Sequence, residues 1–285
     1  MTNNSKTPLE TQWINCPFCG SEESTPWASE NGFTAHKCSD CEFVYVNPIP
    51  CAEIIQKAVE TGIHTELESN KSARARRVNG KVKHYKRLFR KMFADVWTSS
   101  KPISWLDIGA GYGEIVEALT LIAVEGSQIE GVEPMIPKAE YAKNKGLVIH
   151  ATHLNNVRSR YDYVSLVHVF SHIPNFRSFL EEIKEVMNPR GEFFLETGNA
   201  AELKSRNEVP TELDLPDHLT FAGEKHLVGF LEEAGFEILT ISKIRRDGLV
   251  NFCKNIVKKI IGRNVVLRMP YTSNHRAIRI RARLK

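Results

Sequence analysis

The sequence predicts an α/β protein in which a small zinc-binding module precedes a doubly wound, mainly parallel sheet. Three observations support this prediction. Apolar, strand-like runs alternate with helix-like segments from residue 103 onward, three glycines alternate within residues 109–113, and four N-terminal cysteines form two Cys-x-x-Cys pairs. At 285 residues with 42% hydrophobic content, the chain is long enough to bury one main core and a smaller second one.

The cysteine pairs are Cys16-Pro-Phe-Cys19 and Cys38-Ser-Asp-Cys41, with eighteen residues between them. This spacing lies within the zinc-ribbon range of about 15–20 residues. Four thiolates complete a tetrahedral site and leave no position open for a catalytic water. We therefore expect a structural Zn²⁺, since a module of about 50 residues buries too little apolar surface to be stable alone.

The chain is expected to divide at Asn47-Pro-Ile-Pro50, which interrupts regular structure after an alternating strand at 43–46. A short helix is predicted over 52–60. Apolar residues spaced three and four apart predict a basic amphipathic helix from about 72 to 96. The expected parts are a zinc ribbon over 1–50, a helical linker or cap over 51–100, and the main domain over 101–285.

Within the main domain, short apolar runs alternate with helix-like periodicity, the pattern of a parallel sheet. A polar, proline-bearing stretch at 199–217 is expected to lie over the active-site end of the sheet. The predicted strands are 103–108, 129–133, 147–150, 161–167, 192–197, 236–242 and 276–284, and the predicted helices are 114–123, 137–145, 176–187 and 224–234.

The glycine-rich turn follows the apolar run Trp105-Leu-Asp-Ile108 and precedes a predicted helix, whose N-terminus attracts anionic groups. Glycines there allow backbone angles and close approaches that a Cβ would block. The turn lacks the G-x-G-x-x-G spacing of dinucleotide sites, and no Gly-Lys-Ser/Thr follows it to hold a triphosphate. Its sequence resembles motif I of class I S-adenosylmethionine-dependent methyltransferases, with Asp107 ahead of Gly109, Gly111 and Gly113.

This resemblance implies a Rossmann-like sheet of seven strands and S-adenosylmethionine as cofactor. An adenosine cofactor needs a carboxylate at the end of the next strand to accept both ribose hydroxyls, about 20 residues downstream in dinucleotide enzymes. Glu133 closes the run Ile129-Glu-Gly-Val-Glu-Pro134 and takes this place. The resemblance further implies that Leu154 packs near the adenine, and that His168 and Val169 approach the methionine part.

Two histidines are candidates for a catalytic base. His172 follows the strand led by Asp162 and is expected beside the transferable methyl group, at the carboxyl end of the central strand. His218 lies in Asp217-His-Leu-Thr-Phe221, which with Gly235-Phe resembles a signature of methyltransferases acting on sugars. Either histidine could instead order its loop by hydrogen bonding.

Charge is unevenly distributed along the chain. The formal net charge is +4, but residues 71–91 carry ten basic and no acidic side chains, and residues 243–285 carry thirteen basic and one acidic. Such asymmetry indicates an anionic partner, such as a nucleotide-sugar or the surface of an anionic membrane. The sequence shows neither a membrane-spanning stretch nor the apolar core of a signal peptide, so we expect a cytoplasmic protein.

Taken together, these segments resemble bacterial methyltransferases with an N-terminal zinc ribbon that act on nucleotide-sugars and cell-surface glycans. The resemblance implies methylation of a hydroxyl in a polysaccharide precursor. The alternative is a zinc-ribbon methyltransferase of ribosomal RNA, because ten uncompensated positive charges suit phosphate binding. Few aromatic residues lie on the charged face of the basic helix, which disfavours base stacking. Intact Asp107, Glu133 and glycines argue against a non-enzymatic zinc adaptor.

Overall fold

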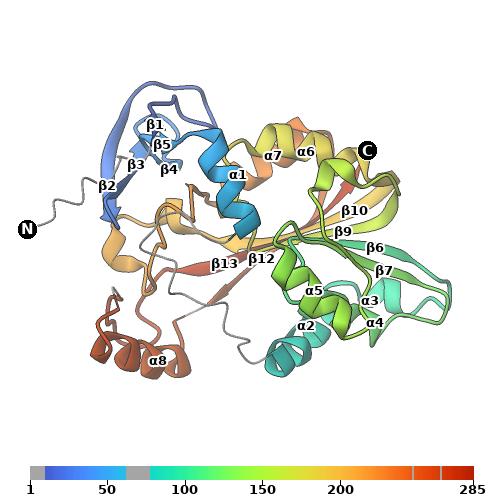
Figure 1. Ribbon diagram of the computed structural model, residues 1–285. Helices are drawn as coiled ribbons and strands as arrows, with labels where there is room; N and C mark the ends of the chain where they lie inside the picture. The colour runs from blue at the N-terminus through green and yellow to red at the C-terminus, as the bar shows by residue number, and fades with distance from the viewer. Residues whose placement is uncertain (1–9, 62–77, 246, 264) are drawn as a thin grey trace, which may run out of the picture.

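The computed structural model describes residues 10–61, 78–245, 247–263 and 265–285 (Figure 1). These residues form a seven-stranded sheet, a four-stranded sheet and a two-stranded pair. The large sheet is formed by strands from residues 104–284, and the small sheet lies beside one end of it (Figure 1). The predicted α/β class with a seven-stranded, Rossmann-like methyltransferase sheet is confirmed.

The large sheet has the order β12-β13-β10-β9-β6-β7-β8. Strands β10, β9, β6, β7 and β8 run parallel to their neighbours, whereas β13 lies antiparallel between β10 and β12. The strand predicted over 276–284 is present as β13. The strands are β6 Ser104–Ile108, β7 Gln128–Val132, β8 Ile149–His150, β9 Tyr161–Val167, β10 Met187–Gly198, β12 Phe236–Arg245 and β13 Arg276–Leu284.

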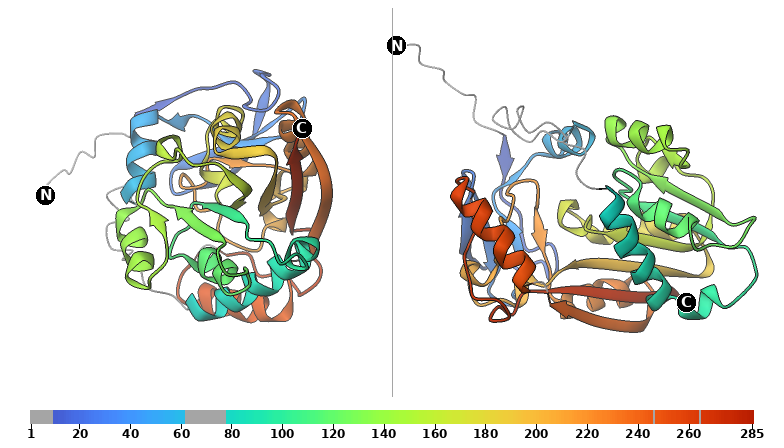
Figure 2. Two further views of the ribbon diagram at one scale, coloured as in Figure 1. Left: turned by 90° about the vertical axis from the view of Figure 1, so that its right-hand side faces the viewer. Right: turned by 90° about the horizontal axis from the view of Figure 1, so that it is seen from below.

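Helices cover both faces of this sheet (Figure 2). Buried side chains of α6 and α7, such as Leu180 and Phe230, pack on one face. On the other face, Phe89 of α2 and Phe93 pack edge-on against the fully buried Trp105, with ring centroids 5.2 and 4.8 Å away. The helices are α2 Val78–Met92, α3 Ala94–Trp97, α4 Glu114–Thr120, α5 Ile136–Asn144, α6 Phe176–Glu185 and α7 Glu224–Glu233.

The predicted basic helix forms α2 and α3, which are separated at Phe93; residues 72–77 of the prediction lie outside the described part of the chain. Its apolar stripe is buried, as the three- and four-residue spacing requires. Lys81 points at the neighbouring helix and donates to Glu114 Oε1 over 3.1 Å. One of the basic side chains is therefore already paired within the protein.

The cysteine-bearing module contributes strands β2–β4 to a sheet of order β11-β4-β3-β2. Its fourth strand, β11, comes from the main domain, and Phe18 and Phe43 stack near Phe230 of α7. Module and main domain thus share a sheet and a core. The elements are β1 Thr11–Gln12, β2 Ser24–Glu30, β3 Phe33–Cys38, β4 Val44–Val46, β5 Ile49–Pro50, α1 Ala52–Thr61 and β11 Thr220–Phe221.

The polar stretch at 199–217 is packed differently from the expectation. Its buried residues, Leu203, Val209, Leu213 and Leu215, join the core of the small sheet, and only Asp217 reaches the cleft described below. These leucines are separated by irregular spacings, so the sequence shows no periodicity that would reveal their burial. Two short 3₁₀ helices, Ala200–Glu202 and Arg206–Glu208, lie within the stretch.

The tip of the β12–β13 hairpin carries a helix that was not predicted, α8 Leu249–Ile260 (Figure 1). It lies at the edge of the molecule, at the end of the hairpin (Figure 2, right). Within the described residues, no helix combines the length and the apolar character that crossing a bilayer requires.

Candidate functional site

A cleft of about 1680 Å³ lies at the carboxyl ends of the parallel strands. One wall is formed by the ends of β6, β7 and β9 and the loops that follow them, which is where open α/β sheets bind ligands. The opposite wall comes from the N-terminal part of the chain and includes Ile14, Ile49 and Ile55. The cysteine-bearing module therefore shapes the cleft as well as flanking it.

The glycine turn is shaped by positive backbone angles. Gly109, Gly111 and Gly113 have φ values of 69°, 56° and 80°, in the left-handed region that favours glycine. A Cβ on Gly109 would lie 2.4 Å from Val169 Cγ2, and one on Gly113 would lie 2.5 Å from Leu147 Cδ1. The turn thus needs glycine for close packing as well as for its φ angles, and Gly109 and Gly111 line the cleft.

Glu133 stands in the cleft wall next to this turn. Its Oε2 accepts the N–H of Gly111 at 2.7 Å, and its Oε1 accepts the N–H of Met135 at 3.0 Å. A carboxylate offers about four lone-pair positions, so each oxygen keeps acceptor capacity after these bonds. The two backbone bonds orient the carboxylate rigidly, with further acceptor positions for a ligand that donates two hydroxyls.

Asp107 occupies a different place from the one expected for a cofactor-contacting residue. Its side chain is buried beneath the glycine turn and does not line the cleft. It accepts the hydroxyl of Ser165 at 2.6 Å, and that hydroxyl in turn accepts the indole N–H of Trp105. Burial raises the pKa of Asp107 to about 8, despite the Ser165 bond; the negative charges of Glu114 and Glu133 act in the same direction.

Leu154, His168 and Val169, the other predicted cofactor contacts, all line the cleft. Leu154 is buried and begins the 3₁₀ helix Leu154–Asn156. His168 has a φ of 61°, and its Nε2 lies 3.3 Å from Glu196 Oε1. The structure therefore gathers these residues with Gly109, Gly111 and Glu133 around one cleft, while Gly113 and Asp107 support the loop from outside it.

The two candidate bases, His172 and His218, lie together although they are far apart in the sequence. His172 Nδ1 donates to the Asp217 carbonyl at 2.8 Å and lies 3.1 Å from Asp217 Oδ1. His218 Nδ1 donates to the Leu213 carbonyl at 2.6 Å, and the two imidazole centroids are 4.8 Å apart. His172, which lies in the 3₁₀ helix Phe170–His172, and Asp217 line the cleft, with His218 packed behind them.

The surroundings shift the pKa values of the two imidazole rings in opposite directions. Burial opposes protonation of His172, but the hydrogen bond and the charge of Asp217 outweigh it, and its pKa is raised. Burial lowers the pKa of His218, and the neighbouring His172 lowers it further. A proton shared by the pair therefore resides on His172, the ring that faces the cleft.

The four cysteines of the two pairs lie at one point of the small sheet, with their sulfur atoms within 4.8 Å of one another. Sγ–Sγ distances of 3.5 Å for Cys16 and Cys41 and 3.6 Å for Cys19 and Cys38 far exceed the length of a disulfide, about 2 Å. They match the edge of a tetrahedron with Zn–S bonds of about 2.3 Å. The four thiols therefore suit a closed four-coordinate metal site.

Sequence reasoning did not identify several residues of the cleft. The N-terminal wall was not assigned to the site, and Asp217 was noted only as the neighbour of His218. Ser165, which supports Asp107 beneath the glycine turn, was not identified either. Adjacency to a candidate histidine was the single available signal for Asp217. Its pairing with His172 depends on how the 3₁₀ helix after β9 meets the segment before β11, a contact that Leu219 N–H makes with the Ser171 carbonyl at 2.7 Å.

Comparison with known proteins agrees with this geometry. Residues 75–241, more than half of the chain, match the sequence profile of a family described as a methyltransferase domain. The chain belongs to this methyltransferase family. The protein is accordingly an enzyme, and the class I S-adenosylmethionine-dependent methyltransferase predicted from motif I is confirmed at that level. The matched segment spans the glycine turn, Glu133 and both candidate histidines, and ends before α8.

Solved structures share the fold of this methyltransferase at low sequence identity. The MccD protein matches with a TM-score of 0.54 and 14% identity over 71% of this chain and 97% of that one. The cyclase SpnF matches at 0.51 and 17% over 70% and 80%, and coclaurine N-methyltransferase bound to N-methylheliamine and SAH at 0.50 and 13% over 70% and 72%. A search of curated proteins finds no match.

Proposed function

We propose that the cleft binds S-adenosylmethionine with its ribose against Glu133. The observation that supports this most strongly is the Glu133 carboxylate in the cleft wall. Two backbone N–H groups orient it, and its oxygens can still accept further hydrogen bonds. Leu154 would contact the adenine, and His168 and Val169 the methionine part. When bound, the cofactor supplies an activated methyl group; the protein's part is to orient it and the acceptor in line.

We propose that the acceptor is a hydroxyl of a sugar, most simply of a nucleotide-sugar or a polysaccharide precursor. A hydroxyl is a poor nucleophile at neutral pH, so its oxygen attacks the methyl carbon effectively only as its proton leaves for a nearby base. His172 faces the cleft, and Asp217 holds its Nδ1–H. Neutral His172 therefore presents its other nitrogen, Nε2, as the proton acceptor, and the resulting imidazolium is stabilised by Asp217.

We also propose that Cys16, Cys19, Cys38 and Cys41 hold a structural Zn²⁺. The sulfur separations support this assignment, and the four-cysteine set leaves no open coordination position. In this arrangement the metal would act on the cleft indirectly, by holding the β2–β4 module against Phe230 and the N-terminal wall in place.

Titration calorimetry with S-adenosylhomocysteine tests the cofactor assignment. The substitution Glu133→Gln removes the charge that would accept two hydroxyls, and we expect affinity to fall about 10- to 100-fold, because bonds to a charged acceptor contribute about 1.5–3 kcal/mol. Glu130→Gln is the control: this residue of β7 accepts bonds from Tyr161 and His150 and does not line the cleft. Equal affinities of wild type and Glu133→Gln would refute the proposed role.

Labelled S-adenosylmethionine incubated with cell extract tests the acceptor class. We expect the label in nucleotide-sugar or glycan fractions that resist ribonuclease. Label in ribonuclease-sensitive polymer would refute the sugar assignment and favour the RNA methyltransferase. Transfer to neither, with cofactor binding intact, would exclude both acceptors without affecting the cofactor site.

A further inference from the structure

Helix α8 turns its apolar side away from the protein. Five apolar side chains of the helix are exposed, and they recur at spacings that place them on one side of a helix with 3.6 residues per turn. Their exposed fractions are 58% for Leu249, 69% for Val250, 36% for Ile256, 59% for Val257 and 79% for Ile260. Ile261, directly after the helix, is 66% exposed and lies next to this stripe.

One polar residue on the opposite side of α8 fixes the helix to the main domain. Asn255 is buried at 7% exposure, and its amide donates to the Pro210 carbonyl at 2.8 Å. A surface helix of a globular protein normally buries its apolar stripe and exposes its polar side. The exposed stripe of α8 departs from this rule and is not used in the core of the described fold.

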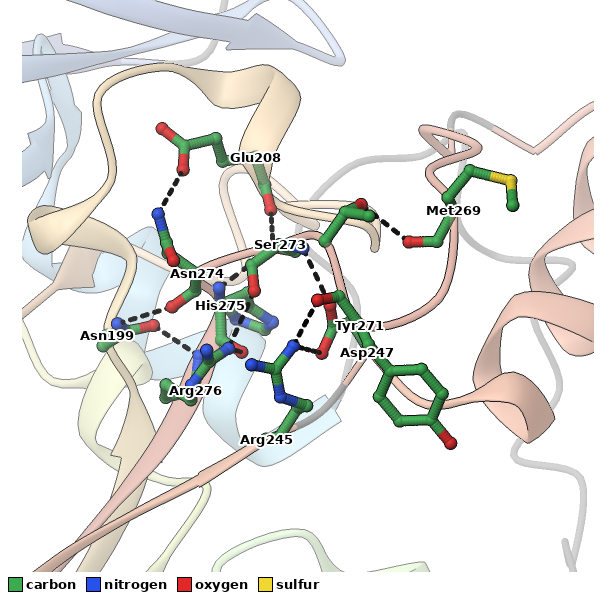
Figure 3. A network of polar contacts seen from close by, with 11 residues as sticks. Asn199, Glu208, Arg245, Asp247, Met269, Tyr271, Ser273, Asn274, His275 and Arg276 are labelled. Atoms are coloured by element: carbon green, nitrogen blue, oxygen red, sulfur yellow. Dashed lines mark hydrogen bonds and ion pairs between the residues drawn. The ribbon is translucent and has the colours of Figure 1, made fainter.

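The insertion that carries α8 is anchored at both ends (Figure 3). Asp247, just before the helix, accepts the N–H of Ser273 at 2.8 Å, and Arg245 donates to the Tyr271 carbonyl at 2.6 Å. Ser273 Oγ also donates to the Glu208 carbonyl at 2.6 Å. These bonds tie the start and the end of the insertion to each other and to the main domain. They therefore hold the apolar stripe in one orientation relative to the main domain.

Positive charge surrounds the stripe. Residues 248–285 contain no Asp or Glu, whereas Lys254, Lys258 and Lys259 lie on α8 itself. The return segment adds exposed Leu267, Met269 and Tyr271. A second copy of this chain on the stripe would bring like charges together. Single-stranded RNA would stack on aromatic side chains, which the aliphatic stripe of α8 does not offer.

We propose that α8 docks the enzyme on an anionic membrane surface. Its aliphatic stripe would enter the boundary between headgroups and acyl chains, and the flanking lysines would contact the anionic headgroups. An exposed apolar face with lysines beside it is the pattern of helices that lie in the membrane interface. Docking through α8 would hold the enzyme at a surface where lipid-linked acceptors would be available. This proposal is independent of how the cleft binds its cofactor.

Cosedimentation of the full-length protein with lipid vesicles tests this proposal. We expect binding to vesicles of phosphatidylcholine with phosphatidylglycerol, weak or no binding to phosphatidylcholine alone, and release at high salt. Val257→Asp combined with Ile260→Asp should abolish binding. Lys254→Gln with Lys258→Gln should lower the partition coefficient about 30-fold, at about 1 kcal/mol for each lysine.

Val148→Asp is the matched control. The exposed fraction of Val148, 53%, is similar to that of Val257, 59%. Val148 lies beside β8, however, at the opposite edge of the large sheet from the β12–β13 hairpin. This variant should bind vesicles as the wild type does. S-adenosylhomocysteine binding, measured on every variant, reports whether the fold is intact.

Three outcomes would overturn the proposal. They are equal binding of the wild type to neutral and anionic vesicles, absence of binding to either, and unchanged binding of the Val257→Asp, Ile260→Asp variant. If light scattering shows that the same variant turns a dimer into a monomer, a second copy covers the stripe instead. In each case cofactor binding remains measurable, so the result does not depend on the proposed function.

Discussion

Two buried carboxylates close to the glycine turn have different environments. Glu133 accepts two backbone N–H bonds and lines the cleft, whereas Asp107 accepts one hydroxyl and has a pKa raised to about 8 by burial. Because Asp107 does not line the cleft, we propose that it supports the turn through β6. Glu133 is the carboxylate that lines the cleft. The sequence alone did not show which of the two carboxylates is exposed to a ligand.

Two glycines with positive φ angles allow the cost of steric overlap to be measured separately from the cost of backbone strain. Gly109→Ala places a methyl group 2.4 Å from Val169 Cγ2 at a φ of 69°, so we expect a loss of about 2–4 kcal/mol in the free energy of unfolding and a weakened affinity for S-adenosylhomocysteine. Chemical denaturation and calorimetry measure the two effects. Gly146→Ala is the control, since its φ is 82° but no atom lies within 4 Å of the added Cβ; it should cost only about 1 kcal/mol.

The Asp217–His172 pair predicts a pH effect. Asp217→Asn removes the charge that raises the pKa of His172, so that pKa should fall, and the acidic limb of activity should move to lower pH. NMR titration of the ring protons measures the shift, with His172→Gln assigning the resonance. An unchanged pKa would contradict the interaction.

The same pair links stability to pH. Because the folded-state pKa of His172 is raised, its stabilising contribution is fully present below the unfolded value, near 6.5, and is lost as pH rises through the folded value. Asp217→Asn should therefore lower stability on the acidic side of this window and leave stability above it nearly unchanged. Denaturation curves across this range provide the measurement.

At the scale of elements, predictions succeeded where a segment is either a largely buried apolar run or an amphipathic helix. The strand over 161–167 has the predicted bounds, and the basic helix buries its predicted stripe. Helix α8 was not predicted although its apolar residues have helical spacing, and that spacing does not show that the stripe faces outward. The burial of Leu203, Leu213 and Leu215 was missed because irregular segments have no period. Lys81 of α2 pairs with Glu114 of α4, so one of the positive charges of α2 is used within the protein.

Arg281 of β13 connects this strand to α3 and to the end of α2. Its guanidinium donates to Asp95 and Glu192 and lies 4.4 Å from the Phe93 ring centroid. Arg281→Met leaves Glu192 buried with only Arg283 as a partner, and we expect a loss of about 3–5 kcal/mol in unfolding free energy.

Two variants serve as controls for this measurement. Arg160→Met breaks a surface pair with Glu185 and should cost less than about 1 kcal/mol. Combining Arg281→Met with Glu192→Leu should restore much of the lost stability, because no buried charge is then left without its partner. If the double variant is as unstable as Arg281→Met alone, the guanidinium contributes through other contacts, such as its bond to the Met92 carbonyl.

At the scale of the whole molecule, the predicted zinc ribbon and the methyltransferase domain are joined rather than adjacent. Strand β11 pairs with β4, and Phe18 contacts Phe230, so the small sheet and α7 share their packing. We expect the protein, with its proposed Zn²⁺, to unfold in one thermal transition. Removing the metal with a chelator should lower that transition and weaken S-adenosylhomocysteine binding together.

Calorimetry with metal analysis tests this coupling. Cys19→Ser should lose metal and show the lowered transition, whereas Cys253→Ser, which changes an exposed thiol on α8, should keep both metal and transition. Two separate transitions, with only the first sensitive to chelator, would show that the modules unfold independently.

The α/β class, the glycine turn, the placement of Glu133 at a strand end and the cysteine pairs could be predicted from the sequence, because each depends on spacing over a few residues. The folded chain was needed to show that Asp107 lies outside the cleft, that Asp217 reaches His172 and that α8 exposes its apolar stripe. These features depend on contacts between segments far apart in the chain. Local periodicity carries no information about which distant segments meet.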